Sequence, residues 1–371
     1  MSLYANSARS SGLWQWSEAI APVPPEARVT LGEGHTPLVR SRVLGPRAGL
    51  PGLYFKLENL CPTGSYKDRF ACVAVADMLA RGRTRCLATS SGNTGAALAG
   101  YCAAAGIPCH VALVEAAPLE KCRQMLAYGA QLHRIEGFGR RTEVTQQVWG
   151  LLQRLGDAPG AALQISCYKI SPVGMTGVQT IALELAGQAP APIDHVFCPA
   201  GGAGAAVAVA RGFRWLEARR ELARVPRIEL VQPRGNDTIA TPLRENWPRG
   251  REVVCETRIS GLQVPDLIDG QLAMDECGAT GGTGHVVEDE WIWQVQARLA
   301  REEGIFCEPA GAVATAAVLQ AVERGELSRD ATVVALVTGS GFKDAPSVAR
   351  MTGDREIPVV PFAQFAAAVE H

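Results

Sequence analysis

The sequence predicts an α/β protein of two domains, each built on a mostly parallel twisted sheet flanked by helices. From about residue 53 onward, short apolar runs alternate with segments of helical periodicity, a pattern typical of parallel sheets. The apolar runs are continuous, as expected for strands that are buried on both faces. The chain has 371 residues, of which 47% are hydrophobic, and this is enough for two cores.

Turn residues and periodicity delimit the individual elements. The expected helices end at glycines such as Gly82, Gly106 and Gly129, which are typical helix stops. We expect strands at 53–57, 86–89, 109–114, 131–135, 164–166, 195–198, 227–231 and 332–337. We expect helices after 67 and at 96–105, 119–128, 143–155, 178–185, 205–218 and 288–303.

The domain division follows from this order. We assign 51–167 to a smaller domain, and 1–50 together with 168–371 to a larger one. Residues 1–28 are irregular and rich in proline, and 236–287 has no clear periodicity.

Composition excludes several classes of partner. The formal net charge is −1, so we expect no binding to nucleic acid or anionic membranes. No apolar run is long enough to span a bilayer, and the N-terminal stretch lacks the pattern of a secretory signal. We therefore expect a cytoplasmic protein.

The 11 cysteines are scattered among apolar neighbours, and no Cys-x-x-Cys pair occurs. This usage is typical of reduced, buried cysteines rather than of a disulfide framework or a zinc site. We expect no metal.

Lys67 lies in the string Pro-Thr-Gly-Ser-Tyr-Lys-Asp-Arg at 62–69. Phe70, Val73 and Met78 recur after it at helical spacing, which places Lys67 on the first turn of a buried helix. The positive end of the helix dipole disfavours the protonated amine, and a neutral lysine can form an imine with an aldehyde. On spacing alone, a solvated surface lysine is the competing interpretation.

Three loops follow predicted strands, where open parallel sheets bind ligands. Ser90, Ser91 and Thr94 belong to a Ser-Ser-Gly-Asn-Thr-Gly turn that suits a carboxylate, although the same residues also form ordinary turns and caps. Thr338 ends the last strand and can bond a neutral ring nitrogen. A small-residue loop suits a phosphate, or only close packing, and comprises Gly201, Gly202, Ala203, Gly204 and Ala205.

One ligand would use all of these features. Pyridoxal 5′-phosphate carries an aldehyde for Lys67, a phosphate for the loop at 201–205 and a pyridine nitrogen for Thr338. The small-residue loop lacks the Gly-Lys-Ser/Thr ending of a nucleotide P-loop, so we discount ATP and GTP.

The ordered motifs resemble the tryptophan-synthase-β-like (fold type II) family of pyridoxal-phosphate enzymes, with the threonine synthase branch most similar. The resemblance covers roughly residues 30 to 350. It is carried by Leu-Gly-Glu-Gly-His-Thr-Pro-Leu at 31–38, Lys-Leu-Glu-Asn at 56–59, the strings at 62–69 and 90–95, Cys-Glu-Pro-Ala at 307–310, and Thr-Gly-Ser-Gly-Phe-Lys-Asp at 338–344.

The resemblance implies roles for matching positions. Lys67 would hold the cofactor and act as the base for the Cα proton, and Asn93 would bond the cofactor's phenolic oxygen. Ser91 and Thr94 would contact the substrate carboxylate. Thr338, a neutral partner of the ring nitrogen, would favour elimination and replacement over transamination. No role is assigned to Tyr66 or Glu308.

One position departs from the family pattern. Gly174 stands where threonine synthases carry an arginine for the substrate phosphate; Arg69, Lys169 or Arg141 would have to substitute. We expect a small amino-acid substrate, a homodimer, and a threonine-synthase-like lyase. The alternatives are β-replacement on an activated serine, dehydration of serine or threonine, and a non-catalytic relative that only binds ligands.

Overall fold

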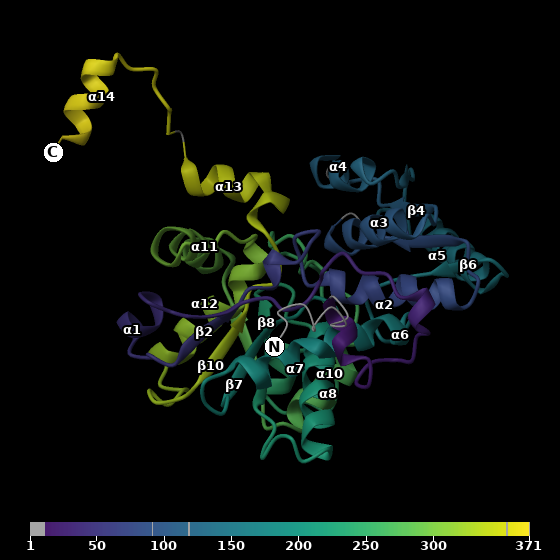
Figure 1. Ribbon diagram of the computed structural model, residues 1–371, viewed down its shortest axis with the longest axis horizontal. Helices are drawn as coiled ribbons and strands as arrows, with labels where there is room; N and C mark the ends of the chain where they lie inside the picture. Colours follow the sequence, from purple (N-terminus) through teal and green to yellow (C-terminus); the bar gives the residue numbers. More distant parts are fainter. Residues whose placement is uncertain (1–11, 91, 118, 354, 371) are drawn as a thin grey trace, which may run out of the picture.

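The computed structural model describes residues 12–90, 92–117, 119–353 and 355–370 and contains two sheets (Figure 1). The larger has the strand order β1-β2-β10-β7-β8-β9 and the smaller β5-β4-β3-β6. Every pair of neighbours is parallel except β1 and β2. The strands are β1 Leu38–Arg40, β2 Leu53–Lys56, β3 Arg85–Thr89, β4 Cys109–Leu113, β5 Gln131–Arg134, β6 Ala161–Leu163, β7 His195–Pro199, β8 Arg227–Pro233, β9 Gly284–Val287 and β10 Val333–Leu336.

The predicted α/β class is confirmed, with helices between the strands in the expected order. The α-helices are α1 Leu44–Ala48, α2 Lys67–Ala80, α3 Asn93–Ala105, α4 Leu119–Ala127, α5 Thr142–Asp157, α6 Pro172–Thr176, α7 Thr180–Gln188, α8 Gly204–Ala218, α9 Ala240–Arg244, α10 Gly270–Gly278, α11 Asp289–Glu303, α12 Pro309–Glu323, α13 Ala345–Thr352 and α14 Phe362–Val369. The 3₁₀ helices are η1 Gly12–Trp16, η2 Pro25–Ala27, η3 Glu58–Leu60, η4 Gly177–Gln179 and η5 Gly341–Lys343.

The strand predicted at 164–166 is wrong. The strand there is β6, Ala161–Leu163, and the chain turns after Gln164. The N–H of Cys167 donates to the Ile165 carbonyl at 2.6 Å, and the N–H of Ile165 donates to Ser171 Oγ at 3.0 Å. These local bonds satisfy the backbone without a neighbouring strand, so the apolar run ends the ladder instead of extending it.

The predicted domain boundary at residue 51 also needs correction. β2 pairs in parallel with β10, with Leu53 opposite Val333, and therefore belongs to the six-stranded sheet. The sheet of the smaller unit begins only at β3. A local apolar pattern identifies a strand but not its partner, which is chosen by packing between distant segments.

Both faces of the six-stranded sheet are buried. Along β7, Val196 and Cys198 face one core together with α7 and α8, whereas Phe197 faces the other together with α11 and α12. Successive side chains of a strand point to opposite faces, so a strand covered on both sides is apolar at every position. This explains the continuous apolar runs in the sequence.

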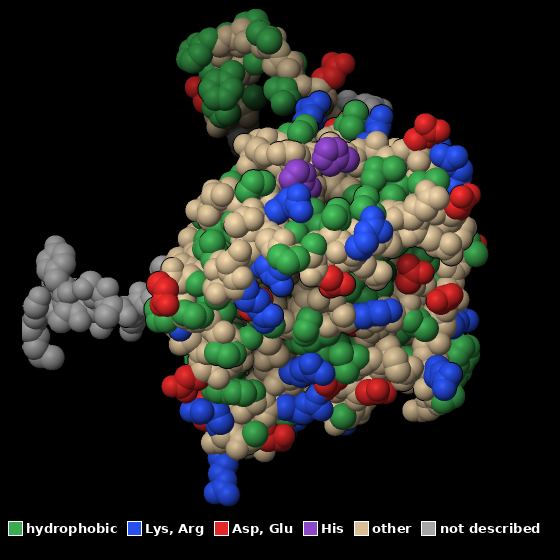
Figure 2. Space-filling view, turned by 90° about the vertical axis from the view of Figure 1, so that its right-hand side faces the viewer, with side chains coloured by type: hydrophobic (Ala, Val, Ile, Leu, Met, Phe, Trp, Pro, Cys, Tyr) green, Lys and Arg blue, Asp and Glu red, His purple; other side chains and the backbone are tan. Residues whose placement is uncertain are grey.

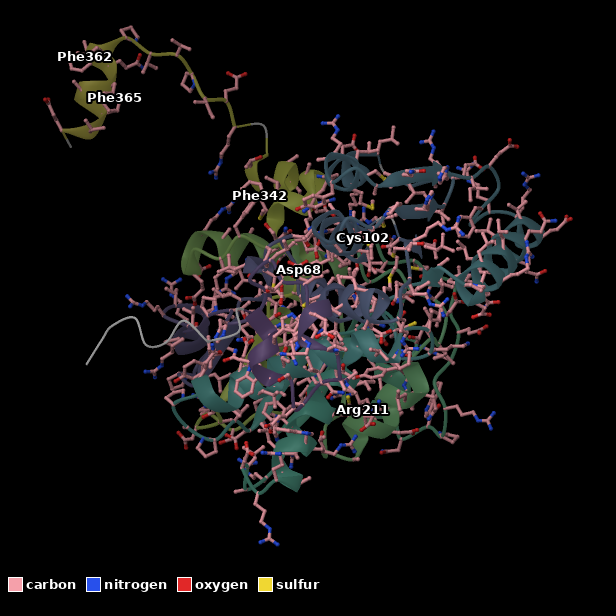
Figure 3. All side chains as sticks on the ribbon, turned by 45° about the vertical axis from the view of Figure 1, so that its right-hand side comes forward. Asp68, Cys102, Arg211, Phe342, Phe362 and Phe365 are labelled. Atoms are coloured by element: carbon pink, nitrogen blue, oxygen red, sulfur yellow. The ribbon has the colours of Figure 1, made fainter. Side chains whose placement is uncertain are left out.

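The surface carries charges of both signs. Figure 2 shows lysine and arginine side chains interspersed with aspartate and glutamate on one face. Beyond α13 the chain leaves the body, and α14 stands apart from it with Phe362 and Phe365 exposed (Figures 1 and 3). Among the described residues, no helix is both long and apolar enough to cross a bilayer.

Candidate active site

Lys67 is the first residue of α2, as predicted. Its Nζ donates a hydrogen bond to Ser166 Oγ at 2.7 Å and lies 4.4 Å from the centroid of the Tyr66 ring. Ser166 follows β6, so the hydroxyl that meets Lys67 comes from the carboxyl end of a strand in the smaller sheet. Lys67 thus lies where the two sheets approach each other.

A buried ion-pair network holds the first turn of α2. Arg69 is fully buried and donates through Nε to Glu58 at 2.7 Å and through Nη1 to Glu184 at 2.6 Å. Lys56 Nζ also donates to Glu184, at 2.6 Å, and Thr36 Oγ1 donates to Glu58 at 2.6 Å. Several motif residues therefore fix the helix that carries Lys67, since a buried charge must be paired.

Backbone bonds place Thr338 beside the lysine loop. The N–H of Tyr66 donates to the Thr338 carbonyl at 3.1 Å, and Ser65 forms a bridge with Gly339. Thr338 is 5% exposed. Among the described residues its hydroxyl has no hydrogen-bond partner, which leaves it available to a ligand.

Asn93 begins α3 and therefore lies on a helix, three residues before the predicted start. Its Nδ2 donates to Glu308 Oε1 at 2.6 Å, and the N–H of Glu308 donates to the Gly339 carbonyl at 3.0 Å. Burial raises the pKa of Glu308 to about 7, while the bond from Asn93 acts in the opposite direction. These contacts join the loop at 90–95 to the loop after β10.

The small-residue loop opens α8, a helix of 15 residues. Within the described part of the chain, the backbone N–H groups from 201 to 205 have no protein hydrogen-bond partner. Ala203 has φ of +64°, a left-handed conformation that turns the loop into the helix. A cradle of open N–H groups at the start of a helix fits a phosphate group.

The loop at 90–95 is described only in part. Ser90 Oγ accepts the N–H of Gly92 at 3.2 Å, so this hydroxyl shapes the turn. Ser91 lies outside the described residues. Thr94 lies in the first turn of α3, where the N–H groups of residues 93–95 have no partner among the described residues. This end of the helix can accept a carboxylate.

The position of Gly174 explains why it carries no arginine. It lies in α6 against α2, and a Cβ added there would lie 2.7 Å from Phe70 Cε2 and 2.8 Å from Ala74 Cβ. Two of the three proposed substitutes are already paired. Arg69 is held in the buried network, and Arg141 lies near Glu136 on the surface, with N···O at 3.6 Å. Lys169 remains; its side chain is exposed, and its backbone N–H donates to Asp269 Oδ1 at 3.1 Å.

Sequence reasoning missed three residues of the site: Ser166, Glu308 in its contact with Asn93, and Asp269. Asp269 accepts the backbone N–H groups of Tyr168 at 2.7 Å and Lys169 at 3.1 Å, and burial raises its pKa. The carboxyl-end rule for parallel strands could have identified Ser166 had β6 been bounded correctly. Asp269 lies in the stretch without periodicity and gave no signal.

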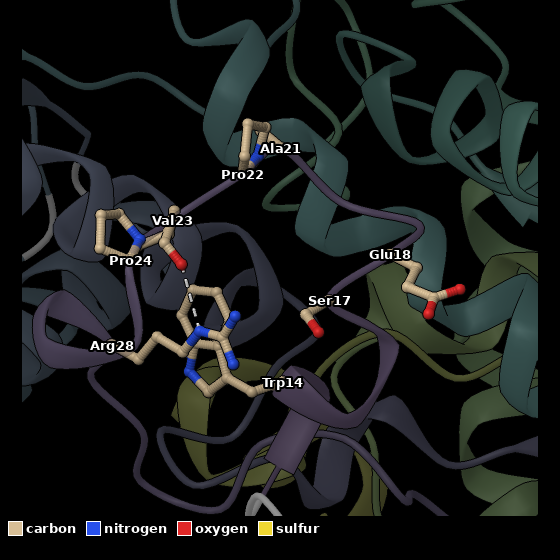
Figure 4. Close-up of a pocket in the computed structure, with 8 residues that line it drawn as sticks. All are labelled: Trp14, Ser17, Glu18, Ala21, Pro22, Val23, Pro24 and Arg28. Atoms are coloured by element: carbon tan, nitrogen blue, oxygen red, sulfur yellow. Dashed lines mark hydrogen bonds between the residues drawn. The ribbon is translucent and has the colours of Figure 1, made fainter.

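A separate hollow of about 430 Å³ lies beside the N-terminal segment (Figure 4). Arg28 crosses it, donating through Nε to the Val23 carbonyl at 3.2 Å and stacking over Trp14 at 5.2 Å from the ring centroid. None of the predicted site residues lines this hollow.

The comparisons with known proteins agree with the site. A sequence model described as pyridoxal-phosphate dependent enzyme matches residues 29–339. Threonine synthase of Methanocaldococcus jannaschii is 32% identical over 350 residues, covering 92% of this chain and 83% of its own. Threonine synthase of Mycobacterium tuberculosis is 33% identical over 341 residues, covering 90% and 89%.

Among solved structures, the processed form of threonine deaminase isoform 2 from Solanum lycopersicum superposes with a TM-score of 0.71. It is 20% identical, with 92% of each chain covered, and this likeness shows the fold alone. The open N–H cradle, the unpaired Thr338 hydroxyl and Lys67 fit the phosphate, ring and aldehyde of the cofactor. The chain belongs to the family of pyridoxal-phosphate dependent enzymes of fold type II, and its cofactor is pyridoxal 5′-phosphate.

Proposed function

We propose that the protein is a lyase of the threonine synthase type, which converts O-phosphohomoserine and water into threonine and phosphate. The observation that carries the proposal is the similarity to threonine synthases over nine-tenths of the chain, at 32% identity over 350 residues in one relative. The unpaired neutral hydroxyl of Thr338 also supports it, because a neutral partner at the ring nitrogen favours elimination over transamination.

In this reaction, different residues of the chain bind the substrate, hold the cofactor and transfer the proton. Bound pyridoxal phosphate supplies an electron sink for the pair of electrons left at Cα. The Lys67 amine is the base that takes the Cα proton, and Ser166 Oγ, at 2.7 Å, orients it. The first turn of α3, where Thr94 lies, binds the substrate carboxylate through open N–H groups, and the side chain of Asn93 bonds the cofactor's phenolic oxygen. The loop at 201–205 holds the cofactor phosphate.

The substrate phosphate needs a cation from another position than 174. Lys169 is exposed, and its backbone is anchored beside the cofactor loop by Asp269. Lys343 Nζ donates to Gln124 Oε1 at 2.7 Å, and burial lowers the pKa of its ammonium. Lys169 is the better candidate, because its exposed side chain has a flexible stem and can turn towards an arriving phosphate.

A second candidate function is β-replacement on an activated serine, or dehydration of serine or threonine. The packing of Gly174 favours it, since a site without the family arginine suits a substrate that lacks a phosphate on its side chain. A non-catalytic relative is disfavoured by an intact Lys67 and an open phosphate cradle.

The test compares kcat/KM of one preparation on O-phosphohomoserine, O-phosphoserine, O-acetylserine, threonine and serine. Highest efficiency on O-phosphohomoserine, with threonine and phosphate formed in equal amounts, supports the proposal. Higher efficiency on threonine or O-acetylserine would assign the second candidate. A colourless protein without turnover would assign the third.

A further inference from the structure

Three cysteines from separate segments of the smaller unit converge inside its core. Cys86 is the second residue of β3, Cys102 lies in the last part of α3, and Cys109 is the first residue of β4. Their sulfur atoms all lie within 4.8 Å of one another. Figure 3 labels Cys102, which lies inside this unit. No other group of three metal-ligating side chains is this close within the described residues.

The fold itself fixes this arrangement. Cys86 and Cys109 are direct partners in the parallel pairing of β3 and β4, so their side chains point to the same face. That face is covered by α3, and the N–H of Ile107 donates to the Cys102 carbonyl at 2.9 Å as the chain leaves the helix. The three thiols therefore sit on rigid elements, which favours a preorganised site.

We propose that Cys86, Cys102 and Cys109 form a binding site for a trivalent thiophilic centre, for which arsenite serves as the probe. A bond from a central atom to sulfur measures about 2.3 Å in zinc thiolates. Two such bonds at an angle of about 100° separate their sulfurs by about 3.5 Å, so sulfurs at most 4.8 Å apart would approach one another by up to about 1.3 Å through rotation of the side chains.

The charge of the bound site favours a trivalent centre over a divalent ion. The sulfurs lie in an apolar core, with exposed fractions of 0% for Cys86 and Cys102 and 4% for Cys109. Coordinating thiols are deprotonated, so three of them around a divalent ion would leave a net charge in this core, and such burial is costly. A trivalent centre with three thiolates is neutral and avoids that cost.

The chemistry balances without an oxidant. Uncharged As(OH)₃ exchanges its three hydroxyl groups for three thiols, forming three As–S bonds and releasing three molecules of water, while arsenic stays trivalent.

The test uses the folded, reduced full-length chain with arsenite and intact-mass spectrometry under native conditions. We expect one arsenic per chain with the loss of three hydrogens from the protein. Cys102→Ala, a mild change in an alanine-rich helix, should lose this adduct. Cys72→Ala is the matched control, because Cys72 is also a fully buried helical cysteine but lies outside the cluster.

Each result of this experiment either supports or overturns the proposed arsenite site. Wild type and Cys72→Ala carrying the adduct, with Cys102→Ala lacking it, would support the site. If Cys102→Ala fails to fold, Cys86→Ala replaces it. No adduct on folded wild type, an adduct that Cys102→Ala retains, or a loss of only two hydrogens would overturn it. Unfolded chain must be absent, because its 11 cysteines would also bind arsenic.

Discussion

Glu308 Oε1 accepts a hydrogen bond from Asn93 Nδ2 at 2.6 Å, and the glutamate is only 3% exposed. This bond joins the first residue of α3 to the residue that precedes α12, across the junction of the two sheets. It makes Glu308 a positioning residue for Asn93, whose amide faces the cofactor in the proposed mechanism.

The buried Glu308 should make stability depend on pH. Its pKa is about 7 in the folded protein, against an ordinary value of 4.5. Between these values the folded state binds more protons than the unfolded state, so the free energy of unfolding falls as pH rises. The fall from this residue is on the order of 3 kcal/mol.

Urea unfolding across this window should give a shallower pH slope for Glu308→Gln than for the wild type. Asp68, whose pKa burial also raises to about 7, contributes a slope of the same sign. Asp68→Asn is therefore the comparison variant. If the free energy of unfolding depends on pH equally in wild type and Glu308→Gln, the carboxyl of Glu308 is ionised across this pH window and the prediction is wrong.

Lys67 should carry the cofactor covalently. Borohydride reduction of the yellow protein should fix the cofactor to the peptide that contains Lys67, because this amine begins α2 beside the open cradle. Lys67→Ala should show no covalent label, whereas Lys169→Ala, which removes an exposed lysine, should be labelled normally. Label on any other lysine would disprove the assignment.

Gly202→Leu should weaken the binding of pyridoxal phosphate. A Cβ at Gly202 would come no closer than 3.9 Å to a protein atom, so the cost falls on the approaching phosphate rather than on the fold. Equilibrium titration with the cofactor measures the effect. Gly187→Leu on the surface of α7, where a Cβ meets nothing within 4 Å, is the control. Unchanged affinity in a folded Gly202→Leu protein would place the phosphate elsewhere.

Thr338→Asp should change the partition of the reaction. A carboxylate in place of the buried neutral hydroxyl would favour a protonated ring nitrogen, which should slow elimination and increase side transamination. Product analysis on the best substrate gives both rates, and Thr338→Ser, which keeps a neutral hydroxyl, should behave like wild type. The ring nitrogen lies elsewhere if Thr338→Asp matches wild type in both.

Gly174→Arg cannot be expected to restore phosphate binding, although the family pattern suggests it. Even Gly174→Ala should lower the free energy of unfolding by about 1–3 kcal/mol, because its Cβ would overlap Phe70 and Ala74 in the packing of α6 on α2. Urea unfolding tests this. Gly187→Ala, in open space, should be neutral or slightly stabilising. Equal stability of the two variants would mean that α6 can shift away from α2.

Local pattern was enough to predict most of the elements and the loops that carry chemistry. Lys67, Asn93 and Thr338 each stand in a motif that is readable within a few residues, next to a strand or helix whose periodicity is also local. The rule that ligands bind at the carboxyl ends of parallel strands then predicted that these loops would meet. The structure brings Lys67, Asn93, Thr338 and the loop at 201–205 to one junction.

Tertiary structure alone decided which distant residues complete the site. Ser166 meets Lys67 across 99 positions of the chain, and Glu308 meets Asn93 across 215. Three further features also depend on contacts between distant segments. They are the pairing of β2 with the larger sheet, the tight contact at Gly174, and the convergence of Cys86, Cys102 and Cys109. Periodicity within one segment reports which face is buried, but the partner on that face is selected by packing between segments, and no local pattern encodes that choice.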